Sequence, residues 1–188
     1  MSGREKLEKY RHIIGLIIII NVLIPKFIFK FLWTITASSE GSLPLLIRYF
    51  YVKKYAKACG DNIFIGKYVT IKNIQGLVLE SNISIHAYVY LDAYGGINIG
   101  KDVSIANHST LVSFEHTWTD SNKPIKYNRV DSKEIKIEND IWIGSGCRIL
   151  SGVTIQTRSI IAAGAVVNKN VHSNVIVGGV PCKVIKHI

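Results

Sequence analysis

The chain has few cysteines, and their arrangement excludes the two frameworks that cysteines most often build. Its 188 residues contain three, Cys59, Cys147 and Cys182. Their spacing fits neither a zinc site nor a set of disulfide pairs. We therefore expect free thiols in a reducing compartment and no metal ion.

Acidic residues are also scarce, and the imbalance of charge is local. The chain carries 13 Asp and Glu against 23 Lys and Arg, a net charge of +10. Residues 1–60 hold ten basic and three acidic residues, whereas the remainder holds thirteen and ten. A uniformly basic chain would suggest nucleic acid. A basic, apolar N-terminus on a nearly neutral body favours an anionic membrane surface instead, and we expect no nucleic-acid partner.

The sequence lacks an uninterrupted apolar run of the roughly 20 residues that a membrane span requires. The run Ile13–Ile24 is shorter and is followed by Pro25, and both Lys26 and Lys30 would have to extend to the membrane interface. A helix lying on the membrane or re-entering it is the favoured interpretation. A true span, a helix packed on the protein itself and a cleaved signal peptide remain alternatives. Residues 1–41 are thus predicted to be a membrane-associating segment.

A second helix is predicted over residues 42–60. The sequence Ser42-Leu43-Pro44 is typical of a helix start, and Gly60 is a plausible stop. The repeats that follow need a cover for their open end, and this helix is expected to supply it.

Residues 61–188 show a repeat of six, which is clearest from Glu134 to Asn170. Apolar residues recur at every sixth place: Ile137, Ile143, Ile149, Ile155, Ile161 and Val167. Two places before each lies a second inward candidate: Ile135, Ile141, Cys147, Val153, Ser159 and Ala165. Three places after each lies a polar or turn-forming residue: Asp140, Gly146, Gly152, Arg158, Gly164 and Asn170. Short strands separated by tight corners explain this period, so an all-β solenoid is predicted.

The same rhythm begins earlier in the chain and is interrupted once. It runs through Ile65, Ile71, Leu77, Ile83 and Val89, slips by four residues at Asp92–Gly96, and resumes at Ile99, Ile105 and Leu111. Residues 112–133 then break it with a polar and aromatic stretch. A rigid scaffold that ejects one long loop usually does so for function.

The ejected loop carries the best candidate for catalysis, His116. It stands near the start of the loop beside Glu115, with Trp118 and Asp120 close behind. Histidine titrates near neutrality and is the commonest general base.

Two further histidines lie on the repeats. His86 and His108 each follow an inward residue by three places, so we expect them to stack at one corner. Together with His116 they could bind zinc. We regard this zinc hydratase alternative as the weaker one.

Three stretches carry a resemblance to a known family. They are IKIENDIWIGSGCRILSGVTI, AAGAVVNKNV and GGVPCKVIK, in that order. From about Gly60 onward the chain resembles the hexapeptide-repeat O-acetyltransferases of the galactoside and maltose type, and within them enzymes that acetylate capsule, exopolysaccharide or lipopolysaccharide sugars. The resemblance implies a left-handed parallel β-helix, a homotrimer and acetyl-CoA as the donor. We expect no metal.

The resemblance also assigns roles to residues. His116 matches the catalytic histidine, and the coenzyme A contacts fall on Ser145, Ala163, Asn168, Lys169, Lys183 and Lys186. The acceptor is expected near His86, Asp92, Tyr94, Glu115 and Trp118. Galactoside-type enzymes have an asparagine where this chain has His86 and an acidic residue where it has Tyr94, with Asp92 as the nearby substitute. A different acceptor is therefore expected.

Acetyl transfer from a thioester to an alcohol needs a base, an oxyanion donor and two substrates held together. His116 supplies the base, and backbone N–H groups near Gly144–Gly146 are candidate oxyanion donors. The sequence thus predicts an acetyl-CoA-dependent O-acetyltransferase for a cell-surface polysaccharide or its lipid-linked precursor. It is expected at the cytoplasmic face of the bacterial inner membrane, or otherwise in the cytoplasm. A hexapeptide acyltransferase for a small molecule or amino sugar is the alternative.

Overall fold

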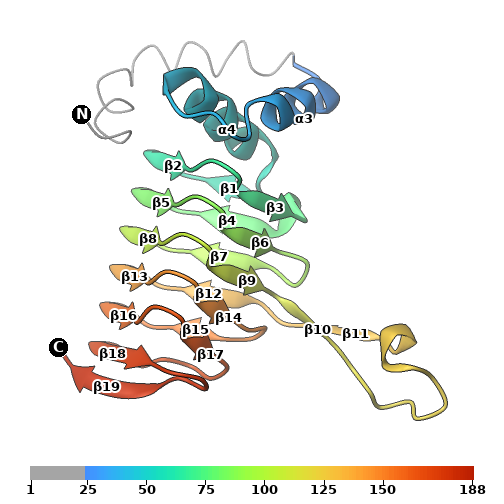
Figure 1. The fold of residues 1–188 in the computed structure, drawn as a ribbon, viewed down its shortest axis with the longest axis vertical. Coiled ribbons are helices and arrows are strands. Elements are labelled where there is room, and N and C mark those ends of the chain that lie inside the picture. The colour runs from blue at the N-terminus through green and yellow to red at the C-terminus, as the bar shows by residue number, and fades with distance from the viewer. Residues whose placement is uncertain (1–23) are drawn as a thin grey trace.

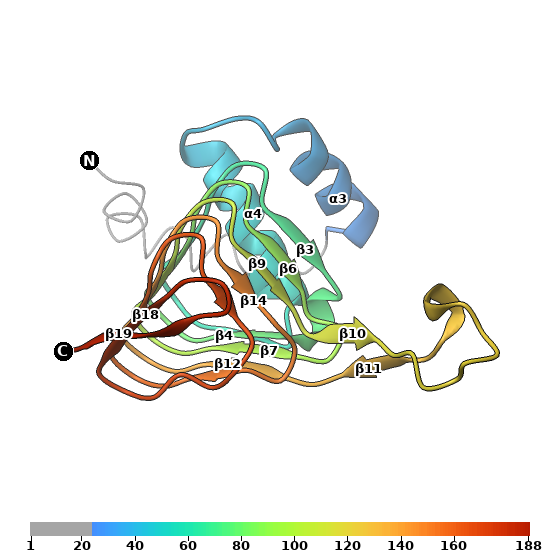
Figure 2. The same cartoon turned by 60° about the horizontal axis from the view of Figure 1, so that its bottom comes forward.

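A computed structural model describes residues 24–188 as a triangular solenoid with two helices over one end and an arm at its side (Figures 1 and 2). Most of the predicted apolar run, residues 13–23, lies outside the described residues. Within residues 24–188, no helix combines the length and the apolar character needed to cross a membrane.

Three parallel sheets form the sides of the solenoid, and the chain visits them in turn. Sheet A contains β1 (Ala58–Cys59), β4 (Leu77–Leu79), β7 (Ile97–Ile99), β12 (Ile135–Ile137) and β15 (Thr154–Ile155). Sheet B contains β2 (Ile63–Ile65), β5 (Ile83–Ile85), β8 (Val103–Ile105), β13 (Ile141–Ile143), β16 (Ser159–Ile161), β18 (Val175–Gly178) and the antiparallel β19 (Lys183–His187). Sheet C contains β3 (Thr70–Lys72), β6 (Tyr90–Asp92), β9 (Thr110–Val112), β14 (Arg148–Ile149) and β17 (Val166–Val167).

The predicted inward residues form the core of this solenoid. All twelve positions of the two apolar series between residues 135 and 167 are buried, including Cys147 and Ser159. Ser159 satisfies its hydroxyl by donating to the carbonyl of His172 at 2.9 Å. The all-β solenoid is confirmed, and its architecture is that of a left-handed β-helix.

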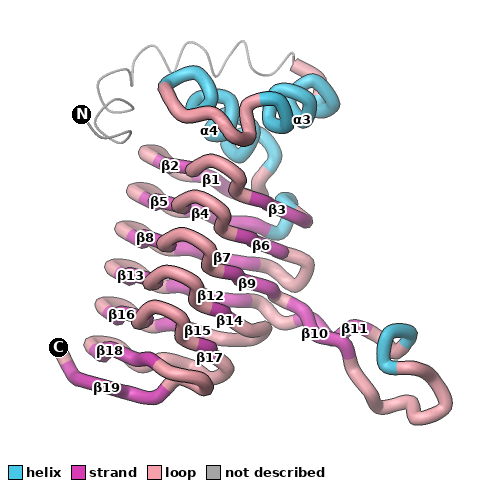
Figure 3. Tube along the Cα trace, in the orientation of Figure 1, coloured by secondary structure: helices cyan, strands magenta, loops and turns pink. Residues whose placement is uncertain are grey.

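The corners need a backbone conformation with positive φ, which most residues avoid. Five of the six predicted corner residues have positive φ, namely Asp140, Gly146, Gly152, Arg158 and Gly164. Asn170 does not, and its side-chain oxygen instead accepts the N–H of Thr154 at 2.8 Å. Short loops separate most consecutive strands in the coils (Figure 3).

The coils are longer at the N-terminal end than the sequence rhythm predicts. Ile85 pairs with Ile105, a step of twenty residues, whereas Ile141 pairs with Ser159, a step of eighteen. One insertion is the predicted slip near Asp92–Gly96. The other was missed, because the short 3-10 helix η1 (Ile74–Gly76) adds residues between β3 and β4 without breaking the apolar rhythm.

Two helices close the N-terminal end of the solenoid. Helix α4 (Ser42–Tyr55) begins where the sequence predicts and ends before Gly60, because the chain turns extended at Ala56 to enter β1. Helix α3 (Lys26–Ile35) packs against it. The buried ring of Phe29 lies 6.3 Å from that of Tyr51, so residues on both sides of position 41 share one packed cap.

The ejected loop is an ordered arm. Strands β10 (Phe114–His116) and β11 (Val130–Ser132) pair antiparallel, and a 3-10 helix, η2 (Ile125–Tyr127), lies beyond them. The buried side chain of Asn128 accepts the N–H of Asp120 at 2.9 Å and donates to the Asp120 carbonyl at 3.2 Å. These hydrogen bonds give the far part of the arm a defined shape (Figure 1).

Candidate active site

His116 lies on the arm, which leaves the solenoid where sheet C passes to sheet A (Figure 2). It is the last residue of β10 and pairs across the arm with Val130. The adjacent Thr117 closes the ladder, donating its N–H and its hydroxyl to the Arg129 carbonyl at 3.1 and 2.8 Å. The imidazole is exposed on a backbone that both strands of the arm hold in place.

The root of the arm is clamped by Ser113, which the sequence did not single out. Its hydroxyl is buried, donates to the Asp92 carbonyl at 2.8 Å and accepts the N–H of Gly95 at 2.9 Å. Gly95 has to be glycine, since an added Cβ would come within 2.3 Å of the Ser113 carbonyl. In the sequence, Ser113 is marked only as a small hydroxyl residue at the point where the apolar repeat breaks.

Aromatic ring contacts extend from the root of the arm to His116. The ring of Tyr94 lies 5.7 Å from that of Phe114, and Phe114 lies 6.5 Å from His116, both edge to face. Glu115 pairs with Asp131 across the arm, and Trp118 is 75% exposed. Tyr94, Glu115 and Trp118 thus lie on or beside the arm with His116.

Asp92 is near this group but is committed to the scaffold. Its side chain is 5% exposed and accepts hydrogen bonds from Asn73 at 2.6 Å and from the Tyr90 hydroxyl at 3.4 Å. The carboxylate therefore fixes the corner of sheets C and A from inside.

His86 is not part of this cluster. It follows β5, at the corner of sheets B and C, where its exposed ring lies 5.7 Å from that of Phe64. Within a single chain, the predicted acceptor residues therefore lie at two different corners of the solenoid.

The expected stacking of His86 on His108 is wrong. Because a coil here takes twenty residues, the ring that stacks on His108 is that of Tyr88, at 4.8 Å, and Tyr88 stacks in turn on Tyr68. Among residues 24–188, no three His, Cys, Asp or Glu side chains are grouped as metal ligands.

The predicted coenzyme A contacts are similarly divided. Ser145 and Ala163 lie one above the other at the corner of sheets B and C, where the Ser145 carbonyl accepts the N–H of Gly164 at 2.8 Å. The Ser145 hydroxyl also bonds the side chain of Asn107. Asn168 and Lys169 follow β17 at the opposite corner of sheet C, and Lys183 and Lys186 lie exposed on β19.

Two of the suggested oxyanion donors are already used by the solenoid. The N–H of Gly144 donates to Ile161 at 2.8 Å, and that of Gly146 donates to Asn107 at 2.9 Å. The suggestion that these two amides bind an oxyanion is therefore wrong, because stacking of the coils consumes their hydrogen atoms.

The three thiols do not form a reactive centre. Burial raises the pKa of Cys59 to about 11 and raises the pKa values of Cys147 and Cys182 as well. A thiol is a nucleophile only as the thiolate. All three side chains are thus in the unreactive form at neutral pH.

Comparison with known proteins identifies the repeats. The family model described as bacterial transferase hexapeptide (six repeats) matches residues 134–169. The solenoid is a hexapeptide-repeat β-helix. The chain is 40% identical over 92 residues to a galactoside O-acetyltransferase of Escherichia coli (strain K12), covering 49% of this chain and 44% of the relative.

Two further matches cover more of the chain. It is 26% identical to a putative lipopolysaccharide biosynthesis O-acetyl transferase of the same strain, over 58% of this chain and 60% of the relative. A solved galactoside acetyltransferase in complex with coenzyme A is 27% identical with a TM-score of 0.73, over 87% of this chain and 80% of that one. The chain spans about half the length of the first two relatives.

Proposed function

We propose that the protein is an acetyl-CoA-dependent O-acetyltransferase that acetylates a sugar hydroxyl of a cell-surface polysaccharide or of its lipid-linked precursor. The observation that carries this proposal is His116, exposed on an anchored arm of a hexapeptide solenoid that resembles a coenzyme A-bound galactoside acetyltransferase. The similarity to a putative lipopolysaccharide O-acetyl transferase supports the polysaccharide acceptor.

His116 is the general base in this proposal. As the sugar oxygen attacks the thioester carbonyl, a C–O bond forms and the imidazole takes the hydroxyl proton. Collapse of the tetrahedral intermediate breaks the C–S bond, and the proton passes to the departing thiolate of coenzyme A. Proton transfer of this kind contributes roughly 10²–10⁴ in rate. The reaction requires no protein nucleophile, in keeping with three protonated thiols.

We further propose that the active unit is a homotrimer with sites between chains. His116 and the pair Ser145 and Ala163 lie at different corners of the prism, so a single chain does not bring the base together with these two donor contacts. Rotation about a threefold axis repeats each corner on a neighbouring chain. The arm of one chain then meets the donor corner of the next.

A location at the cytoplasmic membrane surface completes the proposal. Helix α3 exposes Phe27, Phe31 and Ile35, and Leu43 is exposed at the start of α4. Exposed Lys26 and Lys30 lie on the same helix. An apolar surface interspersed with lysines suits the boundary of an anionic bilayer, near sugars built on a lipid carrier.

The direct test is transfer by the purified full-length protein. We expect acetyl-CoA to acetylate neutral or charged sugars, with product mass increased by one acetyl group. Mass spectrometry of surface polysaccharide from a strain that lacks the protein should show the matching loss of acetyl groups. Transfer to amino groups or to small non-sugar acceptors alone would instead favour the alternative acyltransferase.

A further inference from the structure

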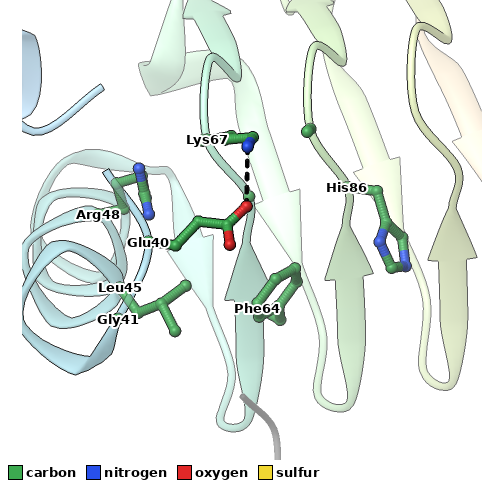
Figure 4. A pocket seen from close by; sticks show the side chains of 9 residues that line it. Glu40, Gly41, Leu45, Arg48, Phe64, Lys67 and His86 are labelled. Carbon is green, nitrogen blue, oxygen red and sulfur yellow. Dashed lines mark ion pairs between the residues drawn. The ribbon is translucent and has the colours of Figure 1, made fainter. Parts of the chain in front are cut away.

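A cavity of about 320 Å³ lies beneath the helical cap, between the start of α4 and the first two coils. Its lining includes Glu40, Leu45, Arg48, Phe64, Lys67 and His86, which surround one space in Figure 4. Volumes from about 300 Å³ upward are typical of ligand sites. The cavity therefore has room for a single sugar ring.

Arg48 gives this cavity a buried positive charge. It is 1% exposed, and its two terminal nitrogens donate to the carbonyls of Thr36 and Ser39 at 3.2 and 3.1 Å. Its Nε has no hydrogen-bond partner in the described chain. Both acceptors are uncharged, and burial lowers the pKa of the guanidinium although Glu40 acts in the opposite direction. A buried charge without an ionic partner is costly.

Lys67 supplies a second cation at the open side. Its ammonium contacts the Glu40 carboxylate at 2.9 Å, and the side chains are 35% and 75% exposed (Figure 4). An exposed pair of this kind contributes little to stability, so another anion can replace the carboxylate at small cost. Arg48 and Lys67 against Glu40 leave an excess of one positive charge before any ligand is counted.

The remaining wall is apolar and flat. Leu45 and the half-buried ring of Phe64 line it, and the ring of His86 stands 5.7 Å from Phe64. Aromatic rings offer a broad apolar face to the C–H groups of a pyranose. The cavity thus combines a surface for a sugar ring with cations for an anionic substituent.

We propose that this cavity binds the anionic group of a charged acceptor sugar, either a carboxylate as in a uronic acid or a phosphate. This inference rests on the proposed function and deepens it, since it concerns the acceptor that receives the acetyl group. A neutral galactoside carries no anionic group for these two cations to bind. The departure at His86 from the galactoside pattern lies in the same cavity.

Variants at the exposed pair test the proposal without disturbing Arg48. Lys67→Gln removes a cation from the cavity, and Glu40→Gln removes the anion that competes for it. Lys101→Gln, at an exposed lysine away from the cavity, is the matched control. Thermal melting of each variant establishes that it is folded.

The probes are methyl β-D-glucuronide, glucose 6-phosphate and neutral methyl β-D-glucoside. Dissociation constants come from calorimetry on the full-length protein, and acetyl transfer is measured in parallel. We expect the wild type to bind at least one anionic probe about tenfold more tightly than the glucoside. Lys67→Gln should reduce that preference about tenfold, because hydrogen bonds to charged groups are the strong ones. Glu40→Gln should increase it, and Lys101→Gln should match the wild type.

The outcomes separate the two proposals. Preference for the glucuronide identifies a carboxylate, and preference for glucose 6-phosphate identifies a phosphate. Equal binding of charged and neutral probes, or a preference that Lys67→Gln leaves intact, overturns the anion site even if sugars are acetylated. Charge-selective binding with no acetyl transfer to any sugar would refute the proposed function and leave the anion site standing.

Discussion

The hydroxyl of Ser113 donates to the carbonyl of Asp92 at 2.8 Å, which joins the root of the arm to the coil before it. The same oxygen accepts the N–H of Gly95. One buried side chain therefore decides where the arm leaves the prism, and with it the position of His116 three residues later.

Ser113→Ala should loosen the arm without removing any group from the proposed chemistry. The N–H of the half-buried Gly95 loses its partner, so the free energy of unfolding should fall by about 0.5–1.5 kcal/mol. Turnover should fall more than affinity for acetyl-CoA. Denaturant unfolding and steady-state kinetics measure both, with Ser132→Ala at an exposed arm position as control. Wild-type kinetics and stability in Ser113→Ala would show that the clamp is dispensable.

His116→Ala should abolish most turnover while leaving the melting temperature and acetyl-CoA affinity unchanged, because the imidazole is exposed outside the core. The expected loss is roughly 10²–10⁴-fold, the usual contribution of a general base. His172→Ala, at another exposed histidine, controls for loss of an imidazole. Turnover within threefold of the wild type would remove His116 from the mechanism.

Mixed trimers test whether the site is shared between chains. Ala163→Trp should block the donor corner, and His116→Ala removes the base, so each homotrimer should be inactive. If base and donor corner come from neighbouring chains, equal mixing after reversible dissociation should restore about a quarter of the sites. Activity assays across the mixing ratio check this. Continued inactivity of mixed trimers, verified by native mass spectrometry, would place each site within one chain.

Removing residues 1–23 should reduce attachment to the membrane and preserve acetyl transfer to a soluble sugar. A deletion of residues 1–41 is a poorer test, since Arg48 donates to carbonyls of Thr36 and Ser39 that it would remove. Flotation with vesicles of anionic and neutral lipids gives the measurement. In the full-length chain, Phe31→Ser should also weaken binding to the vesicles, and Thr34→Ser is its control. Full-length protein that stays with neither vesicle would contradict the membrane location.

Stability should decline at high pH through Cys59. Burial raises its thiol pKa from 9.0 to about 11, while nearby Lys53 acts in the opposite direction. The unfolded thiol ionises first, so the stabilisation is complete below pH 9 and is lost as the pH rises towards 11. The loss is at most roughly 2.7 kcal/mol, at about 1.36 kcal/mol per pKa unit. Urea unfolding at pH 8 to 11 should show a steeper decline for the wild type than for Cys59→Ala, and equal slopes would count against this assignment.

The sequence predicts the coils well because their physics is local. An inward residue such as Ile143 or Ile161 has to be apolar, and the corner residue three places later has to tolerate positive φ, so both leave a period of six. The length of a coil is not local in this sense. The turn of η1 keeps Ile71 and Leu77 six places apart although they belong to non-equivalent positions. A rhythm of six therefore mispredicts the register of neighbouring coils, and it places His86 on His108 where the structure has Tyr88.

The candidate site is less predictable than the fold for a related reason. The sequence singles out His116 because a polar loop interrupts a regular repeat, whereas Ser113 and Gly95 resemble ordinary turn residues until the chain closes around them. The cavity beneath the cap joins Arg48 to Phe64 and Lys67, which approach only when α4 packs on the first coils. No spacing in the sequence indicates that contact.

The antiparallel return of β19 along β18 has a bearing on aggregation. A parallel β-helix presents an open row of hydrogen-bonding groups at its last coil, where another molecule could stack and extend the sheet without limit. Here β19 covers the sheet B edge in the opposite direction and places exposed Lys183 and Lys186 along it. Helix α4 covers the opposite end. Fibre growth by end-to-end stacking of prisms is thereby disfavoured.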